Sequence, residues 1–277
     1  MTINEFKVKS TKLLSSICEN PKFEAEQLLQ FALGIQKNDL LLKRNDNLTS
    51  ENERLLNTLV DRRLSREPLQ YICGEWDFFG LKMYCGKGCL IPRPETEMIA
   101  EYAIKHLPVG GNILDLCTGS GCISVSTLKN RSDVKATAVD ISKEALFYAK
   151  KNAQYHDLST DRLEFICKDM RKFSPDISFD IIVSNPPYIK SADIPELAPE
   201  VQHEPHIALD GGIDGLEFYK IISDNYSKYL KDNGQIVMEV GYDIAEDVKN
   251  VFIESGFKTY IVSDVFGNKR MCVATKY

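Results

Sequence analysis

The strongest structural constraint in the sequence is a run of apolar, mostly β-branched residues that stops at two prolines. Residues 181–184 read Ile-Ile-Val-Ser and predict a buried strand, and Asn185, Pro186, Pro187 and Tyr188 follow directly. Proline fixes φ and has no backbone N–H, so the strand must end here in a rigid loop. That loop offers the Asn185 side-chain carbonyl, proline carbonyls and the flat ring of Tyr188, which together suit a planar NH2 group.

The first part of the chain predicts a small helical domain over residues 1–70. Apolar residues recur there at helical spacing and no strand-like run interrupts them. Asn20 followed by Pro21 predicts the beginning of one helix, and Gly34 predicts its end. Ser50 and Glu53 have the spacing of a capping box at the start of another helix. Residues 71–90 are rich in aromatic residues and glycine, which predicts a β-hairpin linker.

Residues 91–277 predict a second and larger domain in which strands and helices alternate. Such alternation is typical of an α/β fold, a parallel sheet with helices on both faces. The predicted strands are residues 113–116, 135–139, 163–167, 180–184 and 235–240. Two further strand-like runs, 259–265 and 271–275, are joined by so few residues that they predict an antiparallel hairpin. A parallel sheet that ends in such a hairpin fits a methyltransferase better than a dinucleotide dehydrogenase.

A glycine-bearing turn follows the first strand of this domain. The turn consists of Cys117, Thr118, Gly119, Ser120 and Gly121. Glycine in such a turn lets a ligand approach the backbone closely. Asp140 ends the next predicted strand, 19 residues after Gly121, which is close to the ~20-residue offset at which an acidic residue binds ribose hydroxyls. The pair predicts a nucleoside cofactor.

The turn also indicates which nucleoside cofactor is bound. It is not Gly-x-Gly-x-x-Gly, and no Gly-Lys-Ser/Thr follows, so a pyrophosphate is disfavoured. S-adenosylmethionine has ribose hydroxyls for Asp140 and no phosphate. Its adenine is expected beyond the third strand, where Met170 either packs on the ring or belongs to the ordinary core.

Charge and cysteine content limit the partners and the compartment. The net charge is −6 and the pI about 5.4, which gives no bulk attraction to nucleic acid. Eight scattered cysteines and a polar beginning without a signal-peptide core predict a reducing cytoplasm. No apolar run approaches the roughly 20 residues of a membrane span. Cys85 and Cys89 resemble half of a zinc site, but no second pair completes it, so no metal is expected.

Together these motifs resemble the release-factor glutamine N5-methyltransferases, the HemK-like family. The resemblance rests on Asn185–Tyr188, on Ile-Pro-Arg-Pro-Glu-Thr-Glu at 91–97, on Glu-Pro-Leu-Gln-Tyr-Ile at 67–72, and on Glu204-Pro205 with Ala208-Leu209. It spans nearly the whole chain. It implies a Rossmann-like class I S-adenosylmethionine-dependent methyltransferase that methylates the glutamine of the Gly-Gly-Gln motif in bacterial peptide chain release factors and leaves S-adenosylhomocysteine.

The resemblance also implies roles for individual residues. Cys117–Gly121, Asp140, Met170 and Asn185 match cofactor positions, and residues 185–188 match the substrate loop. Family members often have an aromatic residue where Met170 stands and an aromatic residue where His203 stands. No catalytic role is expected for His203. The helical domain is expected to dock the protein substrate, and the enzyme is expected to be a monomer that contacts neither nucleic acid nor membrane.

The motif at 185–188 suggests a mechanism. An amide nitrogen is a poor nucleophile because its lone pair is delocalised into the carbonyl. We expect Asn185 Oδ1 and the Pro186 carbonyl to accept the two amide hydrogens and orient the nitrogen, while Tyr188 stacks on the flat amide. Positioning of this kind can supply much of the ~7–11 kcal/mol available from fixed geometry. No general base is needed, since the methylated nitrogen loses its proton readily.

Three other functions remain open on the sequence alone. Adenine N6 presents the same NH2 group and a stackable ring, but the acidic charge and the lack of a basic recognition domain weigh against nucleic acid. A glutamine on a ribosomal protein is a closer alternative, and the Pro-Glu-Thr-Glu run at 94–97 favours release factors over it. A non-catalytic binding module is disfavoured by the intact Asn185 and Asp140.

Overall fold

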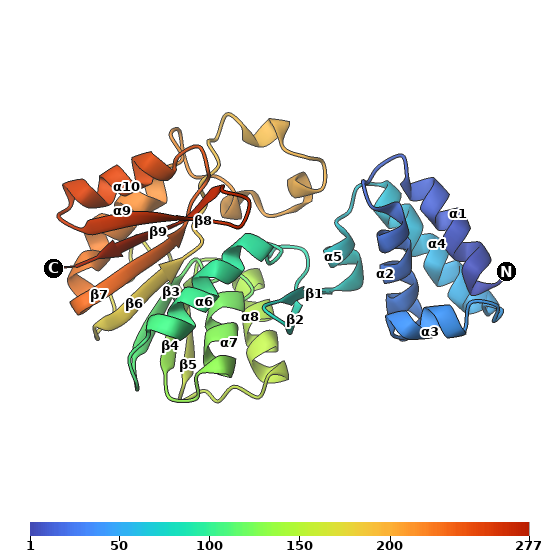
Figure 1. Ribbon diagram of the computed structural model, residues 1–277, viewed down its shortest axis with the longest axis horizontal. Helices are drawn as coiled ribbons and strands as arrows, with labels where there is room; N and C mark the ends of the chain where they lie inside the picture. Colours follow the sequence, from blue (N-terminus) through green and yellow to red (C-terminus); the bar gives the residue numbers. More distant parts are fainter. Residues whose placement is uncertain (277) are drawn as a thin grey trace. The chain divides into compact units, whose positions relative to one another are not determined.

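The computed structural model describes residues 1–276, which form two compact units. One unit comprises Met1–Glu75 together with Ala198–His203, and the other comprises Trp76–Leu197 and the chain from Glu204 onward. Figure 1 shows the helical unit in blue and the sheet of the second unit in green to red. Within residues 1–276, no helix has the length and apolar character needed to cross a membrane.

The first unit is helical, as the sequence predicts. Its helices are α1 (Ile3–Leu14), α2 (Pro21–Leu33), α3 (Lys37–Leu42), α4 (Ser50–Leu64) and α5 (Leu69–Cys73). The core forms where the apolar faces of α1, α2 and α4 meet, with Phe6, Leu28 and Leu56 almost fully buried. Gly34 ends α2 in the left-handed conformation (φ 62°), which confirms the predicted helix end.

Two local predictions for this unit need correction. Thr49, not Ser50, is the N-cap of α4, and its hydroxyl accepts a hydrogen bond from the Asn52 N–H at 3.1 Å. The predicted N-cap is therefore one residue too late in the sequence, because Thr49 and Ser50 are both good capping residues. The aromatic-rich segment that begins at Tyr71 predicts the start of the hairpin, but residues 69–73 form the short helix α5. The hairpin strands β1 (Glu75–Phe78) and β2 (Leu81–Tyr84) follow it.

A buried ion pair lies inside the helical unit. The Arg63 side chain is only 4% exposed, and its guanidinium donates to Glu24 at 2.6 Å and to Glu200 at 3.0 Å. Glu200 also accepts from Arg66 at 2.9 Å. Removing one partner of a buried pair costs several kcal/mol because it leaves an uncompensated charge. These contacts tie the segment Ala198–His203 to the helices, although it follows them by more than 100 residues.

The second unit is built on a mostly parallel sheet. Within residues 1–276, seven strands lie in the order β5-β4-β3-β6-β7-β9-β8. They are β3 (Asn112–Leu116), β4 (Lys135–Asp140), β5 (Leu163–Cys167), β6 (Phe179–Ser184), β7 (Leu230–Glu239), β8 (Lys258–Ser263) and β9 (Lys269–Thr275). β3 to β7 pair in parallel, and β9 is antiparallel to β7 and β8. The predicted parallel sheet with a final antiparallel hairpin is confirmed.

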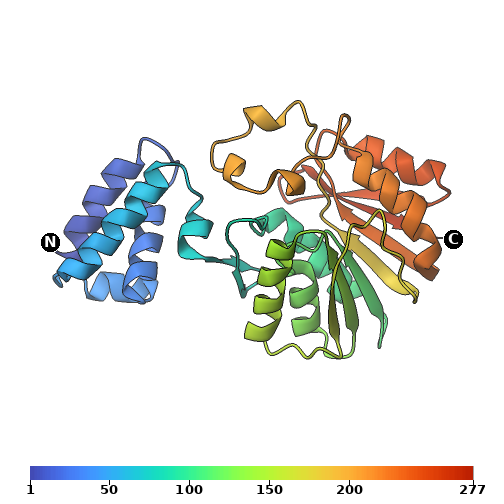
Figure 2. The ribbon, with the colours of Figure 1, turned by 180° about the vertical axis from the view of Figure 1, so that it is seen from behind.

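Helices cover both faces of the sheet, as Figure 2 shows from behind. α6 (Glu97–His106), α7 (Cys122–Asn130) and α8 (Lys143–Tyr155) lie on one face, and α9 (Glu217–Tyr226) and α10 (Ala245–Glu254) lie on the other. Successive strand residues alternate between the two cores, since Ile113 belongs to the first and Leu114 to the second. The central strands β3 and β6 are buried on both faces, which explains why their sequences are mostly apolar.

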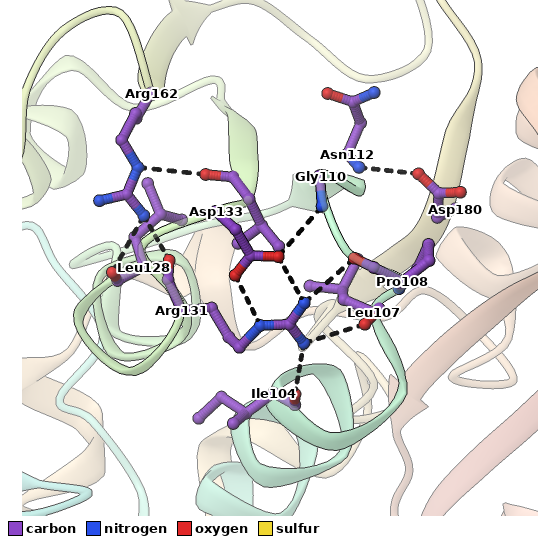
Figure 3. Close-up of polar contacts among 11 residues, drawn as sticks. Ile104, Leu107, Pro108, Gly110, Asn112, Leu128, Arg131, Asp133, Arg162 and Asp180 are labelled. Atoms are coloured by element: carbon purple, nitrogen blue, oxygen red, sulfur yellow. Dashed lines mark hydrogen bonds and ion pairs between the residues drawn. The ribbon is translucent and has the colours of Figure 1, made fainter.

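The amino ends of the parallel strands are fastened by two arginines, drawn in Figure 3. The Arg131 guanidinium donates to the carbonyls of Ile104, Leu107 and Pro108 at 2.9–3.1 Å and pairs with Asp133. The carbonyls at the end of α6 have no partner within the helix, so Arg131 satisfies them. Arg162 binds the Leu128 carbonyl in the same way. The amino ends of the strands thus have a structural role, and they lie at the opposite end of the sheet from the carboxyl ends.

We expect Arg131→Met to lower the free energy of unfolding by about 1 kcal/mol, because several charge-assisted hydrogen bonds are lost at a partly exposed site. Thermal unfolding followed by circular dichroism measures the change. Lys220→Met, which removes an exposed pair with Asp214, is the matched control and should leave the midpoint almost unchanged. Equal midpoints for the two variants would contradict the fastening role of Arg131.

Candidate active site

A pocket of the second unit opens at the carboxyl ends of β3, β4 and β6. β3 lies between β4 and β6, so the strand order changes direction here, and ligands of open α/β sheets bind at such a point. The pocket is lined by the turn after β3, the end of β4, residues 168–171 after β5, the loop after β6, and residues 88–96 before α6. The sequence-predicted cofactor and substrate motifs thus meet in one place.

The turn after β3 takes an unusual backbone path. Cys117, Gly119 and Gly121 all have positive φ, at 57°, 58° and 75°. Glycine tolerates this region, whereas a cysteine there is strained. Cys117, Thr118, Gly119 and Ser120 line the pocket. Gly121 is not among the lining residues: it begins α7, and a Cβ there would lie 3.1 Å from Ala149 Cβ, so its role is close packing of α7 on α8.

Asp140 stands at the end of β4 and lines the pocket. Its Oδ2 accepts from the Gly119 N–H and its Oδ1 from the Ser142 N–H, both at 2.8 Å. Burial raises the pKa of Asp140, and these two backbone donors oppose the rise. A carboxylate oxygen can accept more than one hydrogen bond, so acceptor capacity remains toward the pocket. The carboxylate thereby both fixes the glycine turn and offers sites for hydroxyl groups.

Asp115 is a functional candidate that the sequence reading missed. It is fully buried on β3, and its Oδ2 accepts from the hydroxyls of Thr118 and Ser124, both at 2.6 Å. Its Oδ1 has no donor among residues 1–276. Burial raises the pKa of Asp115 to about 6. The signal was present in the sequence, since an acidic residue inside an otherwise apolar strand is rarely left without a role.

Met170 lies where the cofactor's adenine was expected. It is 5% exposed, lines the pocket and also packs in the core between the sheet and α9. The Cys117 thiol donates to its sulfur at 3.5 Å, and the Tyr226 hydroxyl donates to its carbonyl at 2.7 Å. Met170 is therefore a core residue that also lines the pocket, and its packing on an adenine ring stays a prediction.

The four residues after β6 are placed differently from one another. Asn185 and Pro187 line the pocket, whereas Pro186 and Tyr188 do not belong to its lining. Pro186 is buried, and the Tyr188 hydroxyl donates to Glu239 at 3.2 Å. Burial and the neighbouring Glu239 raise the pKa of Tyr188. The backbone of Tyr188 is tightly covered: a Cβ at Gly211 would lie 2.6 Å from its Cα, and one at Gly215 would lie 2.5 Å from its carbonyl oxygen.

Residues 91–97 meet Glu204, which is 111 residues away from Arg93. Glu204 is 5% exposed and accepts from the Ile91 N–H at 2.9 Å and from the Arg93 guanidinium. Glu97 accepts from the Phe79 N–H at 2.8 Å. Two stretches that the sequence marked only as family motifs therefore hold each other at the pocket wall.

A second contact that the sequence did not reveal joins Thr96, Asn185 and Glu239. Asn185 Nδ2 donates to Thr96 Oγ1 at 3.0 Å, and the Thr96 hydroxyl donates to Glu239 Oε2. Glu239 ends β7 beside the end of β6 and is 3% exposed. Burial raises the pKa of Glu239 to about 7, although the hydrogen bonds from Thr96 and Tyr188 oppose the rise.

The pocket offers acceptors, with no histidine among its lining residues. Among residues 1–276, no group of three or more His, Cys, Asp or Glu side chains is arranged to hold a metal ion. Asn185 Oδ1 receives no hydrogen bond from the described residues. The arrangement can therefore bind hydroxyl groups at Asp140 and hold an NH2 group at Asn185, and both residues line the same pocket.

Comparison with known proteins identifies the family. Residues 8–74 match the family described as PrmC N-terminal domain, and residues 96–205 match the methyltransferase small domain. A release factor glutamine methyltransferase of Thermodesulfovibrio yellowstonii is 39% identical over 259 residues, which cover 91% of this chain and 92% of that protein. One from Geobacter sulfurreducens is 40% identical over 242 residues, covering 86% and 84%.

The solved structures agree on the fold. A methyltransferase from Pyrococcus furiosus superposes with a TM-score of 0.54 at 17% identity, covering 81% of this chain and 98% of that one. The predicted class I methyltransferase fold is thereby confirmed, and so is the resemblance seen in the sequence motifs. With relatives of this identity aligned along nearly its whole length, the chain belongs to the family of release factor glutamine methyltransferases.

Proposed function

We propose that the protein transfers a methyl group from S-adenosylmethionine to N5 of the glutamine in the Gly-Gly-Gln motif of bacterial peptide chain release factors. The observation that carries the proposal is the position of Asn185. Its side chain lines the same pocket as Asp140 and the glycine turn, its amide NH2 is bound to Thr96, and its carbonyl oxygen has no donor within residues 1–276. A substrate amide and a nucleoside cofactor can thus share one cavity.

The residues present fit S-adenosylmethionine. Asp140 keeps acceptor capacity for ribose hydroxyls. The unsatisfied Asp115 Oδ1 lies beside the turn but outside the pocket lining, and it is an acceptor that a water molecule would complete. Met170 supplies a polarizable wall for adenine, and Cys117 to Ser120 supply the turn. When bound, S-adenosylmethionine supplies an electrophilic methyl group on a sulfonium, and it leaves as S-adenosylhomocysteine.

The chain's own residues prepare the amide. Asn185 Oδ1 accepts one amide hydrogen, which fixes the nitrogen and favours its pyramidal form. The second acceptor and the stacking ring that the sequence motif predicts, the Pro186 carbonyl and Tyr188, lie outside the pocket lining, and Tyr188 instead contacts Glu239. Because the reacting nitrogen loses its own proton once it is alkylated, no side chain of the pocket has to act as a strong base. Fixed geometry is then the main catalytic contribution.

In this proposal three segments of the chain have different roles. Residues 1–70 serve as the substrate-docking domain, residues 71–90 as a hairpin linker and residues 91–277 as the methyltransferase domain. The match of residues 8–74 to the PrmC N-terminal domain supports a dedicated role for the helices. The acidic charge supports a protein substrate over nucleic acid. Scattered thiols, four of them buried, support action in a reducing cytoplasm, and we propose a monomer.

The substrate assignment is tested with labelled S-adenosylmethionine and two copies of a release factor, one carrying Gly-Gly-Gln and one carrying Gly-Gly-Ala. We expect label only on the first copy. A ribosomal-protein mixture and adenine-containing DNA are included as alternative acceptors. Label on both release-factor copies would refute the assigned residue, and label only on DNA or on ribosomal protein would move the enzyme to another substrate.

We expect Asn185→Ala to lower kcat by about a hundredfold or more, the size of effect seen when a group that holds the reacting atoms is removed. The affinity for S-adenosylmethionine should stay within a few-fold, because Asp140 and the glycine turn are intact. Asn130→Ala is the control, since within residues 1–276 the Asn130 side chain binds only the Ser126 carbonyl, at the far end of α7. Near-normal turnover of Asn185→Ala would sink the proposed role.

Asp140→Asn tests the cofactor site. Both oxygens of Asp140 accept backbone N–H groups, and asparagine would turn its own NH2 toward one of those donors. We expect S-adenosylmethionine and S-adenosylhomocysteine to bind at least about tenfold more weakly, or 1.4 kcal/mol, by isothermal calorimetry. Asp176→Asn serves as a control away from the pocket. Unchanged affinity in Asp140→Asn, or tight binding of NAD to the wild type, contradicts the assignment.

A further inference from the structure

We propose that Glu239 is a positioning residue that sets the orientation of the Asn185 amide through the hydroxyl of Thr96. Glu239 does not line the pocket, and none of the motifs that identify the family contains it. The inference rests on the proposed function, because it concerns which end of Asn185 faces the substrate amide. It adds two residues, Thr96 and Glu239, to the machinery of the reaction.

The need for such a residue follows from the chemistry of asparagine. The two ends of a carboxamide are nearly identical in shape, one being an acceptor and the other a donor. Only the carbonyl end of Asn185 can accept a hydrogen from a substrate NH2 group. A flipped side chain would present a donor to a donor and would repel the substrate. The amide must therefore be held in one of its two orientations.

Glu239 can set this orientation through two hydrogen bonds in series. An ionised carboxylate only accepts hydrogen bonds, so the Thr96 hydroxyl must donate its hydrogen to Glu239 Oε2. The Thr96 oxygen is then left as an acceptor, and it takes a hydrogen from Asn185 Nδ2 at 3.0 Å. The NH2 end of Asn185 thus faces Thr96, and its carbonyl end is left for the pocket. The negative charge fixes the direction of both hydrogen bonds.

The Thr96 hydroxyl contacts Glu239 and not the backbone of α6. Thr96 immediately precedes α6 and has helical backbone angles (φ −67°, ψ −19°). Its side chain caps no backbone N–H of the first turn, and its hydroxyl donates to Glu239. Thr96 is only 2% exposed although it belongs to the pocket lining.

Glu239 also contacts the other end of the substrate loop, at Tyr188. Glu239 Oε1 accepts from the Tyr188 hydroxyl at 3.2 Å, and the Glu239 backbone carbonyl accepts from the Tyr219 hydroxyl at 2.8 Å. Asn185 and Tyr188 are three residues apart and flank the prolines. One buried carboxylate therefore determines how both ends of the Asn-Pro-Pro-Tyr loop present their side chains.

Protonation of Glu239 would remove the constraint. A carboxylic acid can donate to Thr96, which can then donate to Asn185 and favour the flipped amide. The pKa of Glu239 is raised by burial to about 7, so both forms are accessible near neutral pH. Glu95 adds to the rise and Arg270 opposes it. The groups that face Glu239 from neighbouring elements are Glu95, Thr96, Tyr188, Tyr219, Arg270 and Cys122.

The first test compares Thr96→Val, Thr96→Ser and Thr127→Val in kcat, KM for the release factor and affinity for S-adenosylmethionine. Thr127 is a matched control, because its buried hydroxyl has no partner among residues 1–276. We expect Thr96→Val to lower kcat by about tenfold or more with cofactor affinity retained. Thr96→Ser, which keeps the hydroxyl, should recover most of the activity. Wild-type kcat in Thr96→Val, or no recovery by serine in a variant that melts like the wild type, overturns the proposal.

The second test is the pH profile. If only the ionised form of Glu239 orients Asn185, kcat rises with pH through about 7, which amounts to about a tenfold gain between pH 6 and pH 8. In Glu239→Gln this rise should disappear, whereas in Glu246→Gln, an exposed control on α10, it should remain. A wild-type pH profile in Glu239→Gln would show that Glu239 only supports the fold.

A third measurement needs no substrate and so separates this inference from the proposed function. The carboxyl carbon of Glu239 is titrated by ¹³C NMR in the wild type and in Thr96→Val. Loss of a hydrogen bond to the ionised form should raise the midpoint. A raised midpoint together with failure to methylate release factors would mean that the contact exists and the substrate is different. An unchanged midpoint would overturn the relay itself.

Discussion

Two adjacent parallel strands, β3 and β6, end side by side, and the rest of the site depends on this pairing. Leu116 pairs with Ser184 at the last step of the ladder, so the glycine turn and the Asn-Pro-Pro-Tyr loop leave the sheet at the same point. Neither can continue as strand, because one turns left-handed at Cys117 and the other runs into prolines. The proposed sites of the methyl donor and of the substrate amide are therefore neighbours by topology.

The sequence could predict those features that are local. Prolines end β6, glycines follow β3, and Asp140 stands at a fixed distance along the chain, so strand ends and turn were found from spacing alone. The parallel sheet and its final hairpin followed from alternation. The boundaries were less secure where two capping residues adjoin, as at Thr49 and Ser50.

The contacts that the sequence could not predict join distant residues. Thr96 and Glu239 are separated by 143 residues, and Arg93 and Glu204 by 111. A lone threonine in a proline-rich stretch and a glutamate at the end of a strand carry no local sign of each other. They come together only when the sheet has formed. For the same reason Ala198–His203 reads as loop in the sequence, although its contacts belong to the helical unit.

The two glycines that cover Tyr188 have a consequence for how this family can change. Gly211 and Gly215 press their bare backbone against Tyr188, so the reactive loop takes its shape from main chain rather than from side chains. A side chain at Gly211 or Gly215 would meet this backbone, so either position can change to another residue only if the loop itself moves.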